Sequence, residues 1–173
     1  MTTTTTEPVE VTNLDRYGHA TLPWSRPRDL LRRSATVDVP YFLGTAGPDG
    51  PHAAGIGAVW HDDRLWFVSG PGTRKSRHLA EDDRCTVSAR LEGLDLVLEG
   101  RAARVTDPET LEALVAVYRD SGWPAEVAGD AFTGPYSAPS AGPPPWYLYR
   151  LDLATAVGVA AAEPHGATRW RFS

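Results

Sequence analysis

The chain of 173 residues is 42% apolar and carries a formal net charge of −5. This length suits a single domain with a sizeable core, and the negative charge argues against a protein that coats nucleic acid. No apolar run approaches the roughly 20 residues that a membrane span needs, and the threonine-rich N-terminus lacks the features of a signal peptide. We therefore expect a cytoplasmic protein that binds neither nucleic acid nor membrane.

Residues of the types that commonly bind metals or act as nucleophiles form no recognisable metal or catalytic site in the sequence. Cys85 is the single cysteine, which excludes an internal disulfide and a cysteine-ligated metal, and its place in an apolar strand favours an inert thiol. No two histidines have the HxxxH spacing of a metal pair. His61, Asp62 and Asp63 fall in a tight turn, where solvation explains them. We expect no metal, and no residue stands out as catalytic.

Residues 1–23 combine Thr, Pro and Gly with little hydrophobic periodicity, so we expect a flexible N-terminal arm. Residues 24–173 are interpreted as a single domain, which begins with a short helix and has Ser25 as a plausible N-cap. Alternating apolar runs between Gly, Pro and Asp turns then predict strands. In chain order we expect strands near residues 39–46, 51–60, 65–69, 84–91, 94–105, 146–153 and 167–172.

Two further helices are predicted between these strands, one near residues 74–80 and one after the capping-box pattern Thr106-Asp107-Pro108-Glu109, ending before Gly122. Gly100 inside a long strand indicates a bulge. The Pro/Gly-rich residues 123–145 are typical of a loop that acts as a lid or a subunit contact. Antiparallel strands in meander order, with short helices in their connections, predict a closed or partly closed β-barrel.

The strongest site signal follows the strand at 65–69, where the chain turns at Gly70-Pro71-Gly72 and enters a helix. Thr73 stands at the N-cap position, and the unpaired amides of the first helical turn attract an anion. Ser76 adds a hydroxyl, while Arg74 and Lys75 add charge. This mixture of donors and cations suits a phosphate.

Lys75 strengthens this interpretation, because it is the single lysine among 17 basic residues. A chain that otherwise uses arginine keeps a compact ammonium here, where a planar guanidinium would not serve. The alternative is a solvated basic turn whose cations pair with Glu81, Asp82 and Asp83. A second glycine-rich stretch, Gly55-Ile56-Gly57, lies inside a strand, where it allows either close approach of a ligand or room for a bulky neighbour.

Two segments, LWFVSGPGTRKSRHLAEDDRCTVSA and LVLEGRAARVTDPETLEALVAVY, together resemble the pyridoxamine 5′-phosphate oxidase-like split-barrel proteins. That family includes the flavin- and deazaflavin-dependent oxidoreductases of actinobacteria. The resemblance covers about residues 37–120 and extends more weakly to the C-terminal ATRWRF. It implies a mainly β fold, a six-stranded antiparallel split β-barrel with a few short helices, assembled as a homodimer with cofactor sites at the subunit interface.

The resemblance also implies a cofactor, either FMN or coenzyme F-420, with neither favoured. Lys75 and Arg74 would hold its phosphate, and Ser69 and Thr73 would donate to phosphate or ribityl oxygens. The strand that contains the glycine-rich stretch, around His52 to Gly57, would run under the ring. The partner subunit would contribute from the region of Trp146 and Arg150 or from the C-terminal Arg169 and Trp170. The cofactor-binding residues expected in this way are Ser69, Thr73, Arg74, Lys75, Ser76, His52, Ala53, Ala54, Gly55, Trp146, Arg150 and Arg169.

The activity implied is transfer of a hydride from the reduced cofactor to a small unsaturated substrate, with the protein supplying orientation and a water-poor pocket. Two alternatives keep the fold: a non-catalytic flavin- or haem-binding carrier or sensor, and a pyridoxamine 5′-phosphate oxidase proper. The chain departs from the latter enzymes near Asp95, where they carry a glutamine. A third alternative is a β-barrel interaction module with a solvated basic turn.

Overall fold

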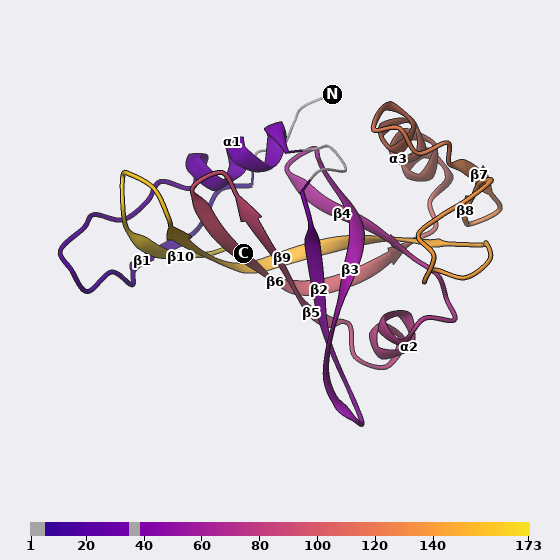
Figure 1. The fold of residues 1–173 in the computed structure, drawn as a ribbon, viewed down its shortest axis with the longest axis horizontal. Coiled ribbons are helices and arrows are strands. Elements are labelled where there is room, and N and C mark those ends of the chain that lie inside the picture. The colour runs from indigo at the N-terminus through magenta and orange to yellow at the C-terminus, as the bar shows by residue number, and fades with distance from the viewer. Residues whose placement is uncertain (1–5, 35–38) are drawn as a thin grey trace.

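The computed structural model describes residues 6–34 and 39–173. The elements of this part of the chain are shown in Figure 1. In chain order they are β1 (Glu10–Asn13), α1 (Ser25–Arg33), β2 (Tyr41–Gly47), β3 (Gly50–His61), β4 (Arg64–Ser69), α2 (Arg74–Glu81), β5 (Arg84–Leu91), β6 (Leu94–Val105), α3 (Pro108–Asp120), β7 (Glu126–Ala128), β8 (Ala131–Thr133), β9 (Tyr147–Ala160) and β10 (Ala167–Arg171).

Six of these strands close into a barrel. Their hydrogen-bonded order is β9-β4-β3-β2-β5-β6, and β6 pairs again with β9. Every pair in this ring is antiparallel. Strand β9 is 14 residues long, so its first half pairs with β4 and its second half with β10. The predicted fold, a mainly β chain with a six-stranded antiparallel barrel and short helices, is confirmed. The predicted meander order is wrong, because β5 pairs with β2 and β4 pairs with β9, so consecutive strands β4 and β5 are not neighbours.

Alternating apolar side chains fill the barrel interior. In β6, Leu94, Leu96 and Leu98 are buried, whereas the residues between them are more exposed. Leu43 on β2 and Val87 on β5 belong to the same buried cluster. Each such side chain stabilises the fold by about 2 kcal/mol through removal of its apolar surface from water. The strand alternation seen in the sequence therefore sets the inside of the barrel.

The predicted irregularity at Gly100 is also confirmed, because the register between β6 and β9 shifts between Glu99 and Gly100. A Cβ atom on Gly100 would lie 2.1 Å from the backbone oxygen of Asp152 on β9. The β9 backbone cannot retreat without loosening the seam that closes the barrel. The close approach therefore requires glycine at this position.

The N-terminal segment differs from the sequence prediction of a flexible arm over residues 1–23. Within it, β1 pairs with β10 and extends the sheet beyond the barrel. Leu22 is buried, and its backbone N–H donates to Oγ1 of Thr168 at 2.8 Å. A strand of four residues is too short to reveal an alternating pattern. The first five residues of the predicted arm lie outside the described part of the chain.

Three local predictions need correction. Residues 123–145 are not a loop throughout, because β7 and β8 form a small hairpin within them. The starts of the first and third predicted helices are each displaced by one residue. The N-cap of α1 is Trp24 rather than Ser25, and the N-cap of α3 is Asp107, whose carboxylate accepts a hydrogen bond from the backbone N–H of Thr110.

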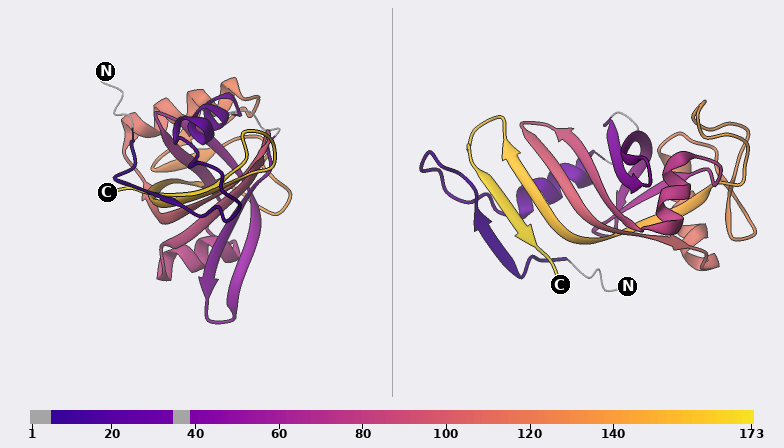
Figure 2. Two further views of the ribbon diagram at one scale, coloured as in Figure 1. Left: turned by 90° about the vertical axis from the view of Figure 1, so that its left-hand side faces the viewer. Right: turned by 90° about the horizontal axis from the view of Figure 1, so that it is seen from below.

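The helices pack around the barrel (Figure 2). Helix α1 contacts β3 and β5, and α2 lies beside β2 and β3. Helix α3 and the β7–β8 hairpin cover the outside of β3 and β4 through a second apolar cluster that includes Trp66 and Phe132. Gly122, at a φ of 97°, follows the end of α3 as predicted. None of the helices in the described residues has the length and apolar character needed to cross a membrane.

Replacement of Gly100 by alanine tests the closing seam. The new Cβ would collide with a backbone oxygen that cannot move, so Gly100→Ala should lower the free energy of unfolding by about 2–3 kcal/mol. Urea denaturation measures this change. The matched control is Gly72→Ala, where no heavy atom lies within 4 Å of an added Cβ and the change should stay within about 0.5 kcal/mol. Equal stability of the two variants would contradict this account of the seam.

Candidate functional site

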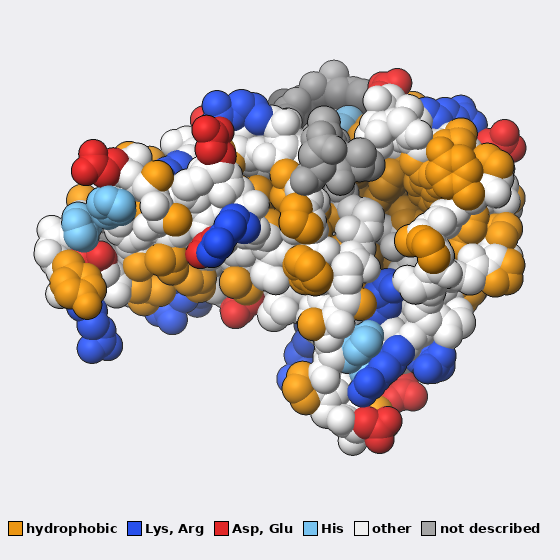
Figure 3. Space-filling model, in the orientation of Figure 1, with side chains coloured by type: hydrophobic (Ala, Val, Ile, Leu, Met, Phe, Trp, Pro, Cys, Tyr) orange, Lys and Arg blue, Asp and Glu red, His pale blue; other side chains and the backbone are white. Residues whose placement is uncertain are grey.

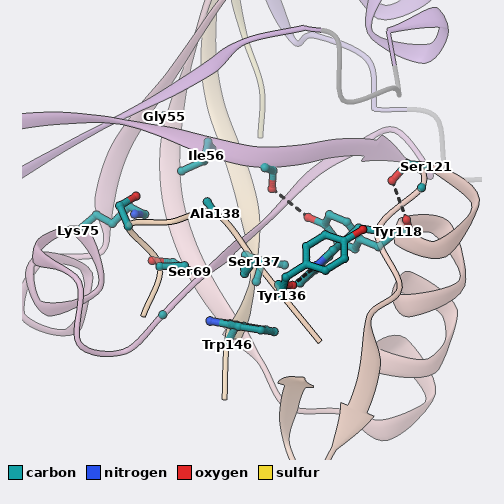
Figure 4. Close-up of a pocket in the computed structure, with 17 residues that line it drawn as sticks. Gly55, Ile56, Ser69, Lys75, Tyr118, Ser121, Tyr136, Ser137, Ala138 and Trp146 are labelled. Carbon is teal, nitrogen blue, oxygen red and sulfur yellow. Dashed lines mark hydrogen bonds between the residues drawn. The ribbon is translucent and has the colours of Figure 1, made fainter. Parts of the chain in front are cut away.

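A pocket of about 380 Å³ opens between the barrel and the segment that follows α3 (Figure 4). One side is the middle of β3, from Gly55 to Gly57, and another is the end of β4 with the start of α2, which contribute Ser69 and Lys75. The remaining lining comes from the C-terminal end of α3 and from residues between Tyr136 and Trp146. The pocket thus joins elements that are far apart in the sequence.

Three hydroxyl groups form a connected network behind the pocket, at the end of β4. Oγ of Ser69 lies 2.7 Å from Oγ of Ser76 and 3.0 Å from Oγ1 of Thr73. Thr73 is the N-cap of α2, as predicted, and its hydroxyl accepts from the backbone N–H of Ser76 and donates to the carbonyl of Gly70. The network fixes the first turn of α2 against the barrel and so sets the direction of Lys75.

Among the described residues, Lys75 is the one charged residue that lines the pocket, and only 8% of it is exposed. Desolvation lowers the pKa of its ammonium group below the ordinary value. No carboxylate of the described residues forms an ion pair with it. A buried cation without a partner is unfavourable, so this end of the pocket attracts an anion.

The carboxylates that follow α2 do not neutralise this lysine. Asp82 pairs with Arg84 at 2.6 Å, and the hydrogen bond from Arg84 lowers the pKa of Asp82 to about 2. Asp83 pairs with Arg101 on β6. The alternative of a basic turn paired with its own carboxylates is therefore wrong for Lys75.

The other predicted site residues fall into three groups. The pocket lining holds Ser69, Lys75, Gly55 and Trp146, and Thr73 and Ser76 support it through the hydroxyl network. Ala54, beside Gly55 on β3, pairs with Leu43 of β2 and is not part of the lining. The remaining residues, which lie elsewhere in the single chain, are His52, Ala53, Arg74, Arg150 and Arg169.

Arg74 turns away from the pocket although it precedes Lys75. It is exposed, and its Nε lies 3.4 Å from Nε2 of the buried His78. The His52 ring lies 5.8 Å from the ring of His78, and desolvation together with the charge of Arg74 lowers the pKa of His52. His52 and Ala53 line a different hollow, on the outer face of β2, β5 and β6.

The two arginines expected from a partner subunit also lie outside the pocket of their own chain. Arg150 pairs with Asp152 at 2.7 Å and lines a third hollow, which includes Trp60. Arg169 is exposed on β10, opposite Thr12 of β1. Trp146 was also expected from the partner subunit, but it lines the pocket of its own chain.

Aromatic residues form the end of the pocket opposite Lys75 (Figure 4). The Tyr118 hydroxyl donates to the carbonyl of Gly57 at 3.1 Å, and burial raises the pKa of this phenol. The Trp123 ring lies 5.4 Å from Tyr118 and 5.6 Å from Trp146. Neither Trp123 nor the second aromatic lining residue of this segment, Tyr136, was predicted from the sequence as a site residue. Their Pro/Gly-rich segment suggested a lid, but no local pattern placed these side chains on the pocket.

The space-filling view shows basic side chains and a histidine gathered around α2, at the foot of the β2–β3 hairpin (Figure 3). Above them, apolar side chains surround a hollow beside α3. The charge and the apolar surface therefore lie at opposite ends of the pocket region. Such a division suits a ligand with an anionic end and an apolar end.

Comparison with known proteins defines the family. The family model described as pyridoxamine 5′-phosphate oxidase matches residues 16–143. The chain belongs to the pyridoxamine 5′-phosphate oxidase family, which confirms the resemblance seen in the sequence. No curated protein matches the chain.

Solved structures support the fold. A NimC/NimA family protein from Clostridium acetobutylicum is 14% identical, with a TM-score of 0.55 and coverage of 84% of this chain and 91% of the other. A pyridoxamine 5′-phosphate oxidase-related, FMN-binding protein from Nostoc punctiforme is 17% identical, with a TM-score of 0.55 and coverage of 86% and 90%. A haem-binding protein from Mycobacterium smegmatis is 15% identical, with a TM-score of 0.59 and coverage of 86% and 59%.

Removal of the buried charge tests the environment of Lys75. Lys75→Met keeps much of the side-chain length and should stabilise the ligand-free protein at pH 7 by on the order of 1 kcal/mol. Because the folded-state pKa of Lys75 is lowered, the unfolded chain binds more protons, and the wild type gains stability as pH rises through the folded-state pKa toward 10.5. The advantage of the variant should therefore shrink over that range.

Urea denaturation at a series of pH values measures this difference. Arg33→Met, at an exposed position in the last turn of α1, is the control and should show no such pH dependence. A destabilised Lys75→Met protein, or an advantage that grows with pH, would contradict the buried and unpaired state of the ammonium group.

Proposed function

We propose that the protein is an oxidoreductase that binds FMN or coenzyme F-420 in the pocket at Lys75 and promotes hydride transfer to a small unsaturated substrate. The observation that carries the proposal is the largely buried side chain of Lys75, whose ammonium group has no ion-pair partner among the described residues. A phosphate bound there would supply the missing counter-charge. The proposal places the protein in the flavin- and deazaflavin-dependent branch of the family.

The pocket residues fit both ends of such a cofactor. Ser69, in the hydroxyl network beside Lys75, offers a neutral donor to the phosphate end. Gly55 and Gly57 leave open space where side chains would stand, since an added Cβ at either position meets no atom within 4 Å. A flat ring can therefore approach the β3 backbone closely, with Trp146 among the aromatic residues of the lining.

The bound cofactor would supply the hydride chemistry, and the chain itself would bind, orient and exclude water. Lys75 holds the anionic end at the start of α2. The apolar and aromatic lining keeps water from the ring end, where Tyr118 is already committed to the carbonyl of Gly57. No side chain is assigned as a general acid. The FMN binding named in the description of the Nostoc punctiforme neighbour supports FMN as the first cofactor to test.

Cofactor binding is the direct test of the proposal. The wild-type protein should bind FMN or F-420 with micromolar or tighter affinity, measured by fluorescence titration. Lys75→Ala should weaken that affinity by about 10- to 100-fold, equivalent to about 1.4–2.8 kcal/mol. Arg33→Ala removes the same charge at an exposed position of α1 and should leave the affinity unchanged. Absence of binding to both cofactors by the wild type would reject the proposal.

Turnover separates the enzyme from the alternatives. An oxidoreductase should consume NAD(P)H or reduced F-420 in the presence of an unsaturated acceptor, whereas a carrier or sensor should bind the cofactor without steady turnover. A pyridoxamine 5′-phosphate oxidase proper should oxidise pyridoxamine 5′-phosphate with oxygen. Cofactor binding without turnover in any of these assays would favour the carrier.

A homodimer is part of the proposal. Phe42 is 50% exposed on the outer face of β2. The strand registers continue from it across the sheet in a row formed by Gly55, Phe42, Ser88, Val97 and Val157. Gly55, at one end of this row, also lines the pocket. A second copy seated on the row would cover apolar surface and close the exposed side of the pocket beside Gly55.

Phe42→Asp tests this arrangement. A carboxylate within the row would be buried in the dimer without a partner, so the dimer dissociation constant should rise by at least about 100-fold. Sedimentation velocity at micromolar concentration should then show a monomer. Tyr17→Asp, at a residue that is 91% exposed near the N-terminus, is the control and should remain dimeric. A monomeric wild type, or an undisturbed dimer in Phe42→Asp, would reject the interface.

A further inference from the structure

Residues 136–142 form a strap across the pocket, between β8 and β9 (Figure 4). In the close-up, Ala138 lies on the side of Lys75, and Tyr136 lies on the side of Tyr118. The strap therefore extends over the length of the pocket from its cationic end to its aromatic end. Its lining residues include Ser137, which adds a hydroxyl over the space beside β3.

Two indole groups hold the strap, one at each end. Nε1 of Trp123 donates to the carbonyl of Tyr136 at 2.7 Å, and Nε1 of Trp146 donates to the carbonyl of Gly142 at 3.1 Å. The two indole rings lie 5.6 Å apart and pack against each other. The same aromatic cluster that lines the pocket thus also tethers the segment that covers it.

Between these tethers the strap has little support of its own. In the described chain, its one internal backbone hydrogen bond runs from the N–H of Ala141 to the carbonyl of Ala138 at 2.9 Å. Ala138 and Ser140 are exposed although they line the pocket, and Tyr136 is 58% exposed. A segment with few buried contacts and few backbone bonds opens locally at low free-energy cost.

The strap also approaches the turn at the end of β4. An added Cβ on Gly70 would lie 2.1 Å from the backbone oxygen of Ala141. Gly70 therefore lets the strap settle directly onto the turn that begins α2. This contact connects the strap to the phosphate end of the pocket, opposite the end that Trp123 holds.

We propose that residues 136–142 are a lid that closes over the flat ring of a phosphorylated heteroaromatic ligand, and that Trp123 is the residue that positions it. This inference rests on the proposed function. The half-exposed ring of Tyr136 loses solvent contact when the lid closes on such a ligand. The ligand then leaves only when the strap releases a tether, so the strap controls the residence time.

Trp123→Phe tests the lid, because it keeps an aromatic ring and removes the N–H that holds Tyr136. With FMN, or with F-420 where the wild type binds only that, stopped-flow fluorescence should show release about 10-fold faster. Hydrogen exchange should rise in residues 136–142 without a comparable rise in the barrel. Trp60→Phe is the matched control, because Nε1 of Trp60 is buried without a hydrogen-bond partner, and its release rate should be unchanged.

Gly70→Ala gives an independent test from the other end of the strap. Its Cβ should displace Ala141, raise exchange over the same residues and speed release. The wild type could bind the cofactor while neither Trp123→Phe nor Gly70→Ala changes the release rate or the hydrogen exchange of the strap. That result would overturn the lid and leave the proposed function intact. Failure of the wild type to bind either cofactor would overturn the proposed function and the lid together. A general loss of thermal stability with unaltered strap exchange would assign Trp123 a structural role only and also reject the lid.

Discussion

The site depends on one unfavourable arrangement, a largely buried lysine side chain whose ammonium group has no ion-pair partner among the carboxylates of the described residues. The fold must hold Lys75 there against the cost of desolvation. The hydroxyl network of Ser69, Thr73 and Ser76 does so by fixing the first turn of α2 to the end of β4. Asp82 and Asp83, which follow α2, pair with arginines on β5 and β6. The strand-to-helix turn therefore presents an unneutralised cation, which is a property of an anion site rather than of a stabilising surface pair.

The barrel brings the two ends of the pocket together through its longest strand. Ser69 ends β4 and pairs with Tyr147, the first residue of β9, so the hydroxyl network lies close to Trp146, which immediately precedes that strand. The opposite edge of β9 pairs with β6 along nearly its whole length, and the bulge before Gly100 lets that seam close. A seam that fixes β9 also fixes the position of Trp146 relative to α2. The geometry of the pocket therefore depends on closure of the barrel.

Much of this arrangement is readable from local sequence, because strand alternation and turn chemistry act over a few residues. The leucines of β6, the glycine bulge and the Thr73 cap follow such rules and were predicted. The helix period also explains why Arg74 leaves the pocket, since consecutive helical residues point about 100° apart, so Arg74 and Lys75 cannot both face it. The contacts of Trp123 and the pairing of β1 with β10 depend on residues distant in sequence. No local periodicity encodes these long-range contacts, so neither was predicted from the sequence.

Gly55 of β3 would connect the pocket to the subunit interface of the proposed homodimer. Gly55 lines the pocket without contributing a side chain to it. Gly55 also pairs with Phe42 on β2 and is therefore the first residue of the row defined above. A side chain there would separate a ligand from the β3 backbone and would also lift a second subunit away from the row. The strap covers the pocket from the side of α3, whereas the row approaches it from the side of β2. Two covers of different origin, one from the same chain and one from a second copy, would together exclude water from a ring that neither could enclose alone.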